Sequence, residues 1–355
     1  MGRERLPRRT VLRAATIAPL AALPFTGHAF GQDATAETVP HTGLDATALH
    51  RAADRAAGLD QLHSLIIARN GDIGFAEAFR GPGLDRVANV KSVSKTIVAA
   101  LAGAALDRGM LESVDQPMAD FLGDRVPAGA DPRVYDITIA DLLTMQAGLE
   151  RTSGSNYGSW VSSRNWIANA LGRPFVAEPG ERMLYSTGSY HLMGAVLAEA
   201  SGQSLLALAR DWLGTPLGIE IPPWVADPQG YYLGGNEMAL SPMALMRFGE
   251  MARLTGLWRE TRVISQEWIE QSWVPRTQSP WSGYAYGYGW FLARGRGNEV
   301  AFARGYGGQM LYLVPSLGLT VVVTSDPTRP ARSDGYVGDL NAMLVQDIIP
   351  AAELG

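Results

Sequence analysis

The sequence predicts a mixed α/β (α+β) fold, in which strands from both ends of the chain form one antiparallel sheet flanked by helices. Three observations predict it. Strand-like stretches occur near residues 63–80 and 299–325, helical spacing dominates between them, and 46% of the 355 residues are hydrophobic. A chain of this size and composition can bury a large core. The helical middle is expected to form a second lobe, with a cleft between the two lobes.

The first 32 residues are interpreted as an export signal of the twin-arginine type. Arg8-Arg9 is followed by an apolar run and by small residues, and cleavage is expected after Ala29 or Gln32. An ordinary N-terminal helix is the alternative, but two prolines interrupt the apolar run. We therefore expect a protein that is exported folded, to the periplasm or beyond the cell.

The remaining residues, 33–355, are expected to form one domain of two lobes. The sheet lobe should comprise about residues 44–91 and 276–355, and the helical lobe about residues 92–275. Composition limits the partners of this domain. The formal net charge is -5, and removal of the signal, with five arginines and one glutamate, makes it about -9. Such an acidic protein is a poor candidate for binding nucleic acid or anionic membranes, and no other segment is apolar enough to span a bilayer.

The N-terminal part of the sheet lobe is predicted from local patterns. Residues 44–58 have helical spacing of apolar side chains and end at a glycine. Residues 63–69 read as a strand, Asn70-Gly71 as a tight hairpin turn, and residues 73–80 as the returning strand. A helix followed by a hairpin is therefore expected at this end.

The C-terminal part supplies three more strands. They are expected over residues 299–304, 309–314 and 319–325, with a Pro-Ser-Leu-Gly turn at 315–318 and a closing helix over 335–347. The middle of the chain instead shows helical periodicity interrupted by Gly- and Pro-rich loops. Its expected helices cover residues 92–108, 137–146, 190–201, 204–213 and 242–256.

The chain contains 28 arginines but only two lysines, and these flank one serine. Lys95 lies three residues after Ser92, on the same face of the expected helix, where its amine can reach the serine hydroxyl. The helix that follows is small and apolar, so Lys95 should be desolvated and lose its proton more easily than usual. An arginine could not act in this way. Ser92 as a helix cap is the alternative interpretation.

Other routes to nucleophilic or metal chemistry find little support. The chain has no cysteine, no G-x-S-x-G elbow, and no histidine after His191. These features argue against a cysteine nucleophile and against an α/β-hydrolase triad. The histidines do not have metal-ligand spacing, so neither a metal nor another cofactor is expected. A serine activated by a lysine remains as the best-supported chemistry.

Three spaced motifs extend this interpretation. They are Ser92-Val93-Ser94-Lys95, the segment PGERMLYST at 179–187, and Gly305-Tyr306-Gly307-Gly308-Gln309 before a strand; the segment DLLTMQAGL at 141–149 lies between the first two. Over about residues 60–347 the chain resembles the serine beta-lactamase and penicillin-binding-protein superfamily, on its class C and esterase side. The stretches GYGGQMLYLVP and GYYLGGNEM resemble its branch of 6-aminohexanoate-oligomer hydrolases and related esterases.

The resemblance implies roles for the motif residues. Ser92 would be the nucleophile, Lys95 its proton partner, and Tyr185 the general base that activates the deacylating water. Tyr185 can do this only if a cation lowers its pKa, and Lys95 is the expected cation. The oxyanion hole would combine the N–H of Ser92 with that of Gln309.

Other positions are expected to shape substrate binding. Gly307 and Gly308 suit close approach of substrate to the backbone. Thr187 stands where the family carries an asparagine, and Tyr306 stands where it carries a lysine or histidine. The uncharged Tyr306 argues against efficient binding of beta-lactam carboxylates. Lys91 is expected to be a bystander at the cleft rim.

The loop around residues 156–160 occupies the region where the resembling enzymes carry a substrate-covering tyrosine. Tyr157 could donate a proton to a leaving amine, or it could be an exposed loop aromatic. Trp160 and further aromatic residues could line a cleft for an extended apolar chain, or belong to the core. Those further residues are Trp166, Trp281, Tyr284 and Tyr286.

Together these features predict a serine hydrolase that cleaves small esters or linear amides through an acyl-enzyme, without a cofactor. A neutral or cationic acyl part fits best, and the partner is a small-molecule substrate. Two alternatives stay open. One is a beta-lactamase or D,D-peptidase, against which Tyr306 argues. The other is a catalytically silent protein that binds a ligand in the same cleft.

Overall fold

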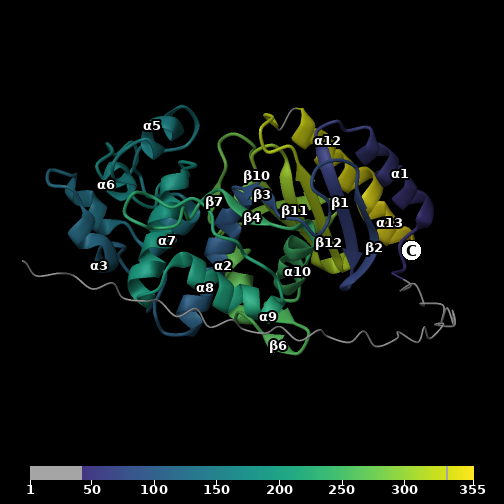
Figure 1. The fold of residues 1–355 in the computed structure, drawn as a ribbon, viewed down its shortest axis with the longest axis horizontal. Helices are drawn as coiled ribbons and strands as arrows, with labels where there is room; N and C mark the ends of the chain where they lie inside the picture. Colours follow the sequence, from purple (N-terminus) through teal and green to yellow (C-terminus); the bar gives the residue numbers. More distant parts are fainter. Residues whose placement is uncertain (1–41, 333–334) are drawn as a thin grey trace, which may run out of the picture. The chain divides into compact units, whose positions relative to one another are not determined.

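The computed structural model describes residues 42–332 and 335–355. The expected export signal lies outside the described residues. An eight-stranded antiparallel sheet forms the centre of the fold, in the order β2-β1-β12-β11-β10-β9-β8-β7 (Figure 1). Its strands are β1 (Leu62–Arg69), β2 (Asp72–Ala78), β7 (Thr277–Gln278), β8 (Ala285–Tyr286), β9 (Phe291–Gly295), β10 (Asn298–Gly305), β11 (Gln309–Val314) and β12 (Leu319–Ser325).

The sheet joins the two ends of the chain, as predicted. β1 pairs with β12 in an antiparallel register that places Leu65 opposite Val323, and β2 closes the N-terminal hairpin beside β1. All seven residues of β12 are buried, as are six of the eight in β1. Near-continuous burial means that both faces of these strands are covered, because alternate side chains point to opposite faces.

Helices provide this cover. In Figure 1, α1 (Ala46–Ala57), α12 (Tyr336–Met343) and α13 (Ile349–Leu354) lie on one side of the sheet, and α2 (Val93–Asp107) and α10 (Pro242–Arg253) on the other. α10 falls inside the range expected for the helical lobe, yet it packs against β1, β11 and β12. Gly249 allows this close packing, because a Cβ there would lie 2.6 Å from the Leu311 side chain.

The helical part of the molecule is organised around α7 (Thr187–Ser201), which contacts α2 and several shorter helices. The first eleven residues of α7 are buried, so it is a central rather than a surface helix. The shorter helices are α3 (Ala119–Leu122), α4 (Ile139–Thr144), α5 (Tyr157–Val161), α6 (Trp166–Leu171), α8 (Leu205–Ala209), α9 (Thr215–Leu217) and α11 (Gln266–Ser272). Five helices were expected over residues 92–256, and each is present, with bounds that differ by up to about one helical turn.

Two small sheets complete the structure. β3 (Ala88–Lys91) pairs with β4 (Met238–Leu240), and β5 (Leu257–Trp258) pairs with β6 (Thr261–Arg262). The β3–β4 pair matters for the site, because β3 ends next to Ser92 and β4 begins directly after Glu237. Within residues 42–332 and 335–355, no single helix is long and apolar enough to cross a bilayer, although one helix pair bent by 86°, Thr187–Ser201 with Leu205–Leu217, matches by length and composition.

Candidate active site

A cavity of about 550 Å³ opens where the start of α2, the start of α7 and the end of β10 meet. Its lining comes from widely separated parts of the sequence. It includes Lys91, Ser92, Ser153, Tyr157, Tyr185, Thr187, Asn236, Glu237, Trp281, Phe291, Arg304, Gly305 and Tyr306. Residues from the helical part and from the sheet therefore face one another across this cavity.

Ser92 lies immediately before α2, and its side chain makes no capping hydrogen bond to that helix. The capping interpretation therefore does not describe this serine. Lys95 Nζ instead donates a hydrogen bond to Ser92 Oγ at 3.1 Å. The serine hydroxyl is thus held against an amine one helical turn away and at the same time lines the cavity.

Lys95 is almost completely buried, with 2% of its surface exposed. Its Nζ donates to the carbonyl oxygen of Gly235 at 2.7 Å and contacts Thr187 Oγ1 at 3.4 Å. None of the ion pairs in the described residues involves Lys95. Burial without a carboxylate partner lowers the pKa of Lys95 to about 7. A substantial neutral fraction at pH 7 makes this amine able to accept a proton from Ser92.

Tyr185 precedes α7 and lines the same cavity. Burial raises the pKa of the Tyr185 phenol, while a hydrogen bond with Ser92 and the charge of Arg304 act in the opposite direction. Lys95 Nζ lies over the Tyr185 ring, 4.9 Å from its centroid. Arg304 is therefore the cation that opposes the rise in the phenol pKa, a role for which the sequence analysis had expected Lys95.

Arg304 lies at the site, although the sequence analysis did not single it out. It lies on β10 and lines the cavity, and its Nη2 donates to the carbonyl oxygen of Ala331 at 3.1 Å. Desolvation in this place lowers the pKa of the Arg304 guanidinium. The available signal was a basic residue directly after the apolar run VAFA at 300–303 and directly before Gly305-Tyr306. The cleft thus contains a cation on its sheet side, although Tyr306 is uncharged.

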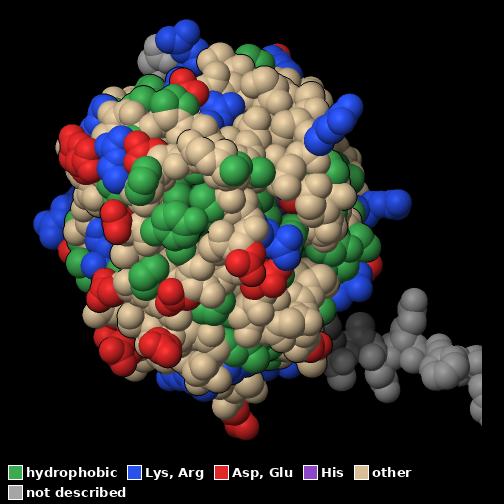
Figure 2. Space-filling model, turned by 90° about the vertical axis from the view of Figure 1, so that its left-hand side faces the viewer, with side chains coloured by type: hydrophobic (Ala, Val, Ile, Leu, Met, Phe, Trp, Pro, Cys, Tyr) green, Lys and Arg blue, Asp and Glu red, His purple; other side chains and the backbone are tan. Residues whose placement is uncertain are grey.

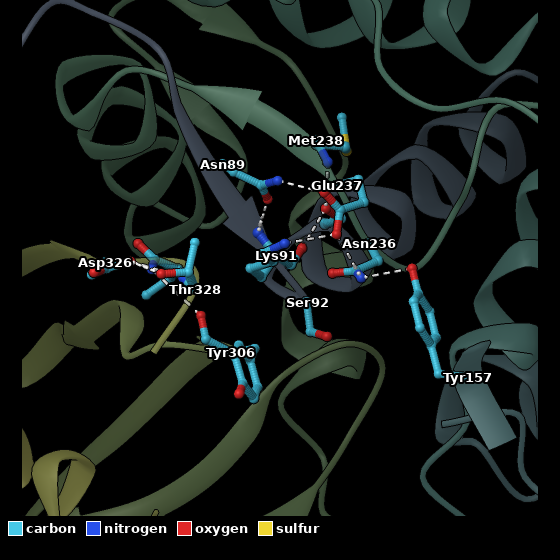
Figure 3. Close-up of polar contacts among 12 residues, drawn as sticks. Asn89, Lys91, Ser92, Tyr157, Asn236, Glu237, Met238, Tyr306, Asp326 and Thr328 are labelled. Carbon is cyan, nitrogen blue, oxygen red and sulfur yellow. Dashed lines mark hydrogen bonds and ion pairs between the residues drawn. The ribbon is translucent and has the colours of Figure 1, made fainter. Parts of the chain in front are cut away.

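A polar network forms another wall of the cavity (Figure 3). Lys91 Nζ is ion-paired with Glu237 Oε1 at 2.8 Å. The Asn236 amide donates both to Glu237 Oε1 and to Tyr157 Oη, each at 3.1 Å. Lys91, expected only at the rim, is therefore part of a charged pair in the wall. Tyr157 faces the cavity with its hydroxyl oxygen already accepting a hydrogen bond.

Thr187 lies where the sequence analysis expected it, at the cavity beside Lys95. Its backbone N–H and its Oγ1 both contact Ser153 Oγ, at 2.8 and 2.9 Å. Ser153, which sequence reasoning did not single out, thereby fixes the first residue of α7. The contact needs two segments 34 residues apart in the chain, so no local pattern could indicate it.

Several residues expected at the site lie elsewhere. Gln309 is fully buried, and its amide forms hydrogen bonds in both directions with the backbone of Ser325, at 2.8 and 2.9 Å. Neither Gln309 nor the preceding Gly307 and Gly308 lines the cavity; that strand edge contributes Gly305 and Tyr306 instead. The residues of this segment that face the cavity therefore lie earlier in the chain than expected, at Gly305 and Tyr306 rather than at 307–309.

The aromatic residues that were expected to line the cleft are likewise found partly at the cavity and partly in the core. Trp160 is fully buried and donates from Nε1 to the carbonyl oxygen of Trp166 at 2.9 Å, within a cluster that also contains Leu233. Tyr286 is also buried. Trp281 lines the cavity, and 56% of its surface is exposed. Trp160, Trp166 and Tyr286 thus belong to the packed interior, and Trp281 to the cleft.

The chain is similar to known proteins, both in family and in sequence. The Beta-lactamase family model matches residues 63–344. The D-alanyl-D-alanine-carboxypeptidase/endopeptidase AmpH of Escherichia coli K12 is 24% identical over 314 residues, which cover 76% of this chain and 80% of AmpH. The probable fimbrial assembly protein FimD of Dichelobacter nodosus is 30% identical over 146 residues, 39% of this chain, and the match spans only 36% of FimD.

Solved structures share the fold. A candidate 6-aminohexanoate-dimer hydrolase from Bacillus anthracis superposes with a TM-score of 0.71 at 16% sequence identity, covering 86% of this chain and 81% of the other. The similarity therefore extends over most of the sheet and of the helical part. At this identity it shows a common fold.

Proposed function

This chain belongs to the beta-lactamase family of serine hydrolases, and we propose that it cleaves small esters or linear amides through an acyl-enzyme intermediate. One observation carries the proposal. Ser92 Oγ accepts a hydrogen bond from the buried Lys95 amine, whose pKa burial lowers to about 7, and the serine faces a cavity large enough for a small substrate.

In acylation, the neutral amine of Lys95 accepts the Ser92 proton while Oγ attacks the substrate carbonyl carbon. The new C–O bond gives a tetrahedral intermediate with its negative charge on the former carbonyl oxygen. This intermediate collapses by breaking the bond to the alcohol or amine, which leaves with a proton. Lys95 thereby returns to its neutral form, with the acyl group on Ser92.

The oxyanion is proposed to lie between the N–H groups of Ser92 and Tyr306. A Cβ on Gly305 would lie 2.4 Å from the Val90 carbonyl oxygen and 3.1 Å from Lys91 Cβ, so the end of β10 packs directly against the residues before Ser92. Tyr306 is the next residue, and it lines the cavity. Two backbone donors close to the nucleophile stabilise developing charge far better than water does. Tyr306 takes the role that had been expected for Gln309.

Deacylation requires a water molecule activated near the ester bond. The Tyr185 phenol is hydrogen-bonded to Ser92, so it lies next to the acylated oxygen, and the Arg304 charge favours its ionised form. The water oxygen attacks the acyl carbonyl carbon, and we assign acceptance of its proton to Tyr185 acting together with the neutral amine of Lys95. The tetrahedral intermediate then collapses by breaking its bond to Ser92 Oγ, which takes up that proton, and the carboxylic acid product leaves.

Intact mass measured seconds after mixing with an activated short-chain acyl ester tests the proposal. An acyl adduct is expected on the wild-type protein and not on Ser92→Ala. Absence of both an adduct and ester turnover in the wild type would instead indicate a cleft that only binds ligands.

A D,D-peptidase is a second candidate, supported by Arg304. A cation on the strand that borders the cleft can pair with a substrate carboxylate, and AmpH shares 24% identity with this chain. Release of D-alanine from a peptide ending in D-Ala-D-Ala, measured beside nitrocefin turnover, would favour this candidate. Turnover of simple esters alone would disfavour it.

A further inference from the structure

A second cavity, also of about 550 Å³, lies next to the catalytic one, and Trp281 lines both. Trp281 is carried by the loop between β7 and β8, which is closed by a hydrogen bond from Gly283 N–H to the Ser279 carbonyl oxygen at 2.9 Å. A single exposed indole on a short loop therefore separates the two cavities. This arrangement suits a substrate that is longer than the catalytic cavity alone accommodates.

The indole lies between a catalytic side chain and a guanidinium. The Trp281 ring meets the Tyr185 ring edge-on, with 6.4 Å between centroids. The Arg151 guanidinium carbon lies 4.9 Å from the centroid of the Trp281 ring. Tyr185 lines the first cavity and Arg151 the second. A short linear substrate bound at Ser92 would therefore extend past Trp281 toward Arg151.

The charged groups of the second cavity are unequally compensated. Of its two carboxylates, Glu150 is ion-paired with Arg173 at 2.7 Å, and Glu181 accepts a hydrogen bond from the Glu178 backbone N–H at 2.9 Å. Within the part of the chain that the structure describes, neither Arg151 nor Arg182 forms an ion pair with a carboxylate. Arg182 Nη2 donates to the carbonyl oxygen of Val176 at 2.7 Å, which holds that guanidinium at the wall without neutralising its charge. The cavity is therefore lined by two guanidinium charges, one of them already hydrogen-bonded to the backbone.

We propose that this second cavity is a subsite for a carboxylate, and that the preferred substrate is a linear ester or amide with a carboxylate at the end that lies beyond Trp281. The guanidinium fork matches a carboxylate geometrically, and its contact with the indole pre-orients it. This inference rests on the proposed hydrolase function and specifies its substrate class. Arg151 and Arg182 are specificity-determining residues in this assignment.

Two matched substrate pairs test it. Mono-p-nitrophenyl adipate and p-nitrophenyl hexanoate differ only in a carboxylate on the acyl side. The butyrate ester of 4-hydroxybenzoate and that of its methyl ester differ only in a carboxylate on the leaving side. In one of the two pairs, the wild-type protein is expected to show the higher kcat/KM for the carboxylate member.

The double variant Arg151→Gln, Arg182→Gln should reduce this preference about tenfold, the effect of losing one charge-assisted hydrogen bond in a partly exposed site. Arg164→Gln is the matched control, because Arg164 is exposed and lines neither cavity. If the arginines only support the Trp281 loop, the double variant should lose activity equally toward both members of a pair. Arg151→Lys should then fail to keep the preference for the carboxylate member. An unchanged ratio in both pairs overturns the proposal.

Binding measured without turnover separates this inference from the hydrolase function. Adipate titrated calorimetrically into the wild-type protein should bind more tightly than its neutral analogue adipamide. The double variant should lose that difference, whereas Arg164→Gln should keep it. If adipate shows this dependence but no ester is cleaved, the subsite stands and the hydrolase proposal fails. If adipate binds the double variant as well as the wild type, or binds neither, the subsite is refuted.

Discussion

At the scale of single residues, the two lysines of the chain offer a matched pair for substitution. Lys95→Arg should lower kcat by about 10³-fold or more, because a guanidinium cannot accept the Ser92 proton. Lys91→Arg should cost no more than a few-fold, since an arginine can keep the ion pair with Glu237. Ester turnover and circular dichroism of both variants check this. Retained activity in a folded Lys95→Arg protein would refute the lysine mechanism.

The pH dependence should follow from the same residue. Burial lowers the Lys95 pKa to about 7, and the neutral amine is the active form. We expect kcat/KM to rise with pH around a midpoint near 7, and to lie about tenfold below its high-pH plateau at one pH unit below that midpoint. A profile that is flat between pH 5.5 and 8.5 would contradict this assignment.

The depressed lysine pKa also has a consequence for stability. Between about pH 7 and the ordinary lysine pKa, the unfolded chain binds a proton that the folded protein does not. Unfolding is therefore increasingly disfavoured as pH rises through this window, and below it the charged amine is buried at a cost. In Lys95→Met, this contribution to the pH dependence of the free energy of unfolding should disappear. Denaturant titrations of both proteins at several pH values measure the difference.

Tyr157 allows a test that separates amides from esters. The Asn236 amide donates to Tyr157 Oη, and the Glu237 carboxylate fixes the orientation of that amide, so the phenol proton is left to point elsewhere. Burial raises the Tyr157 pKa, which keeps this proton in place near neutral pH. An amine needs a proton to leave, whereas p-nitrophenolate does not. Tyr157→Phe should therefore reduce amide turnover about 10²-fold and affect p-nitrophenyl esters much less; equal losses would exclude a donor role.

How much of the site could be predicted depended on sequence separation. Ser92 and Lys95 are three residues apart, so helix geometry alone brings them together, and the structure places them in contact. Arg304 acts on Tyr185 only because the end of β10 and the segment before α7 line the same cavity, a relation that no local pattern contains. The sequence analysis expected Gln309 at the cavity, whereas Tyr306 lines it, because the exact end of β10 cannot be read from a glycine-rich turn.

At the scale of elements, the contact between α10 and the sheet yields a stability prediction. Glycine usually weakens a helix, so Gly249→Ala should stabilise α10 in isolation. In the protein, the new Cβ would lie 2.6 Å from Leu311 and 2.8 Å from Thr320, and we expect a net destabilisation of about 1–3 kcal/mol. Gly123→Ala is the control, because a Cβ there meets nothing within 4 Å. Chemical denaturation of both variants measures the difference, and equal stabilities would show that α10 can move away from the sheet.

Length and periodicity decided which elements could be predicted from the sequence. Long elements with a clear period, such as β1, β12, α1 and α2, were found close to their bounds. β7 and β8 have two residues each and therefore no period, so they were missed. α10 was found as a helix but expected with the helical lobe, because amphipathic spacing shows that a face is buried without showing what covers it.

At the scale of the whole molecule, electrostatics agree with a small-molecule role. On the face shown in Figure 2, acidic and basic side chains are interspersed around apolar ones, without a continuous basic surface. The full chain has a formal net charge of -5, so the protein offers little to a polyanion. Basic side chains also line the two cavities, at Arg304 in the catalytic cavity and at Arg151 and Arg182 beyond Trp281.

The joining of the two chain ends leads to a last prediction. α13 contacts α1, the Asp45 N–H donates to the Ala351 carbonyl oxygen at 2.8 Å, and α13 buries Ile349, Ala351 and Ala352. Ending the chain at Ile348 exposes the apolar surface that these residues cover, which costs about 3 kcal/mol at 25 cal/mol per Å². None of the removed residues lines either cavity. We therefore expect the shortened protein to lose several degrees of Tm, yet to retain the kcat/KM of the full chain at temperatures well below its transition. Loss of activity in a still-folded protein would show that the terminal helices position the catalytic cavity through the sheet.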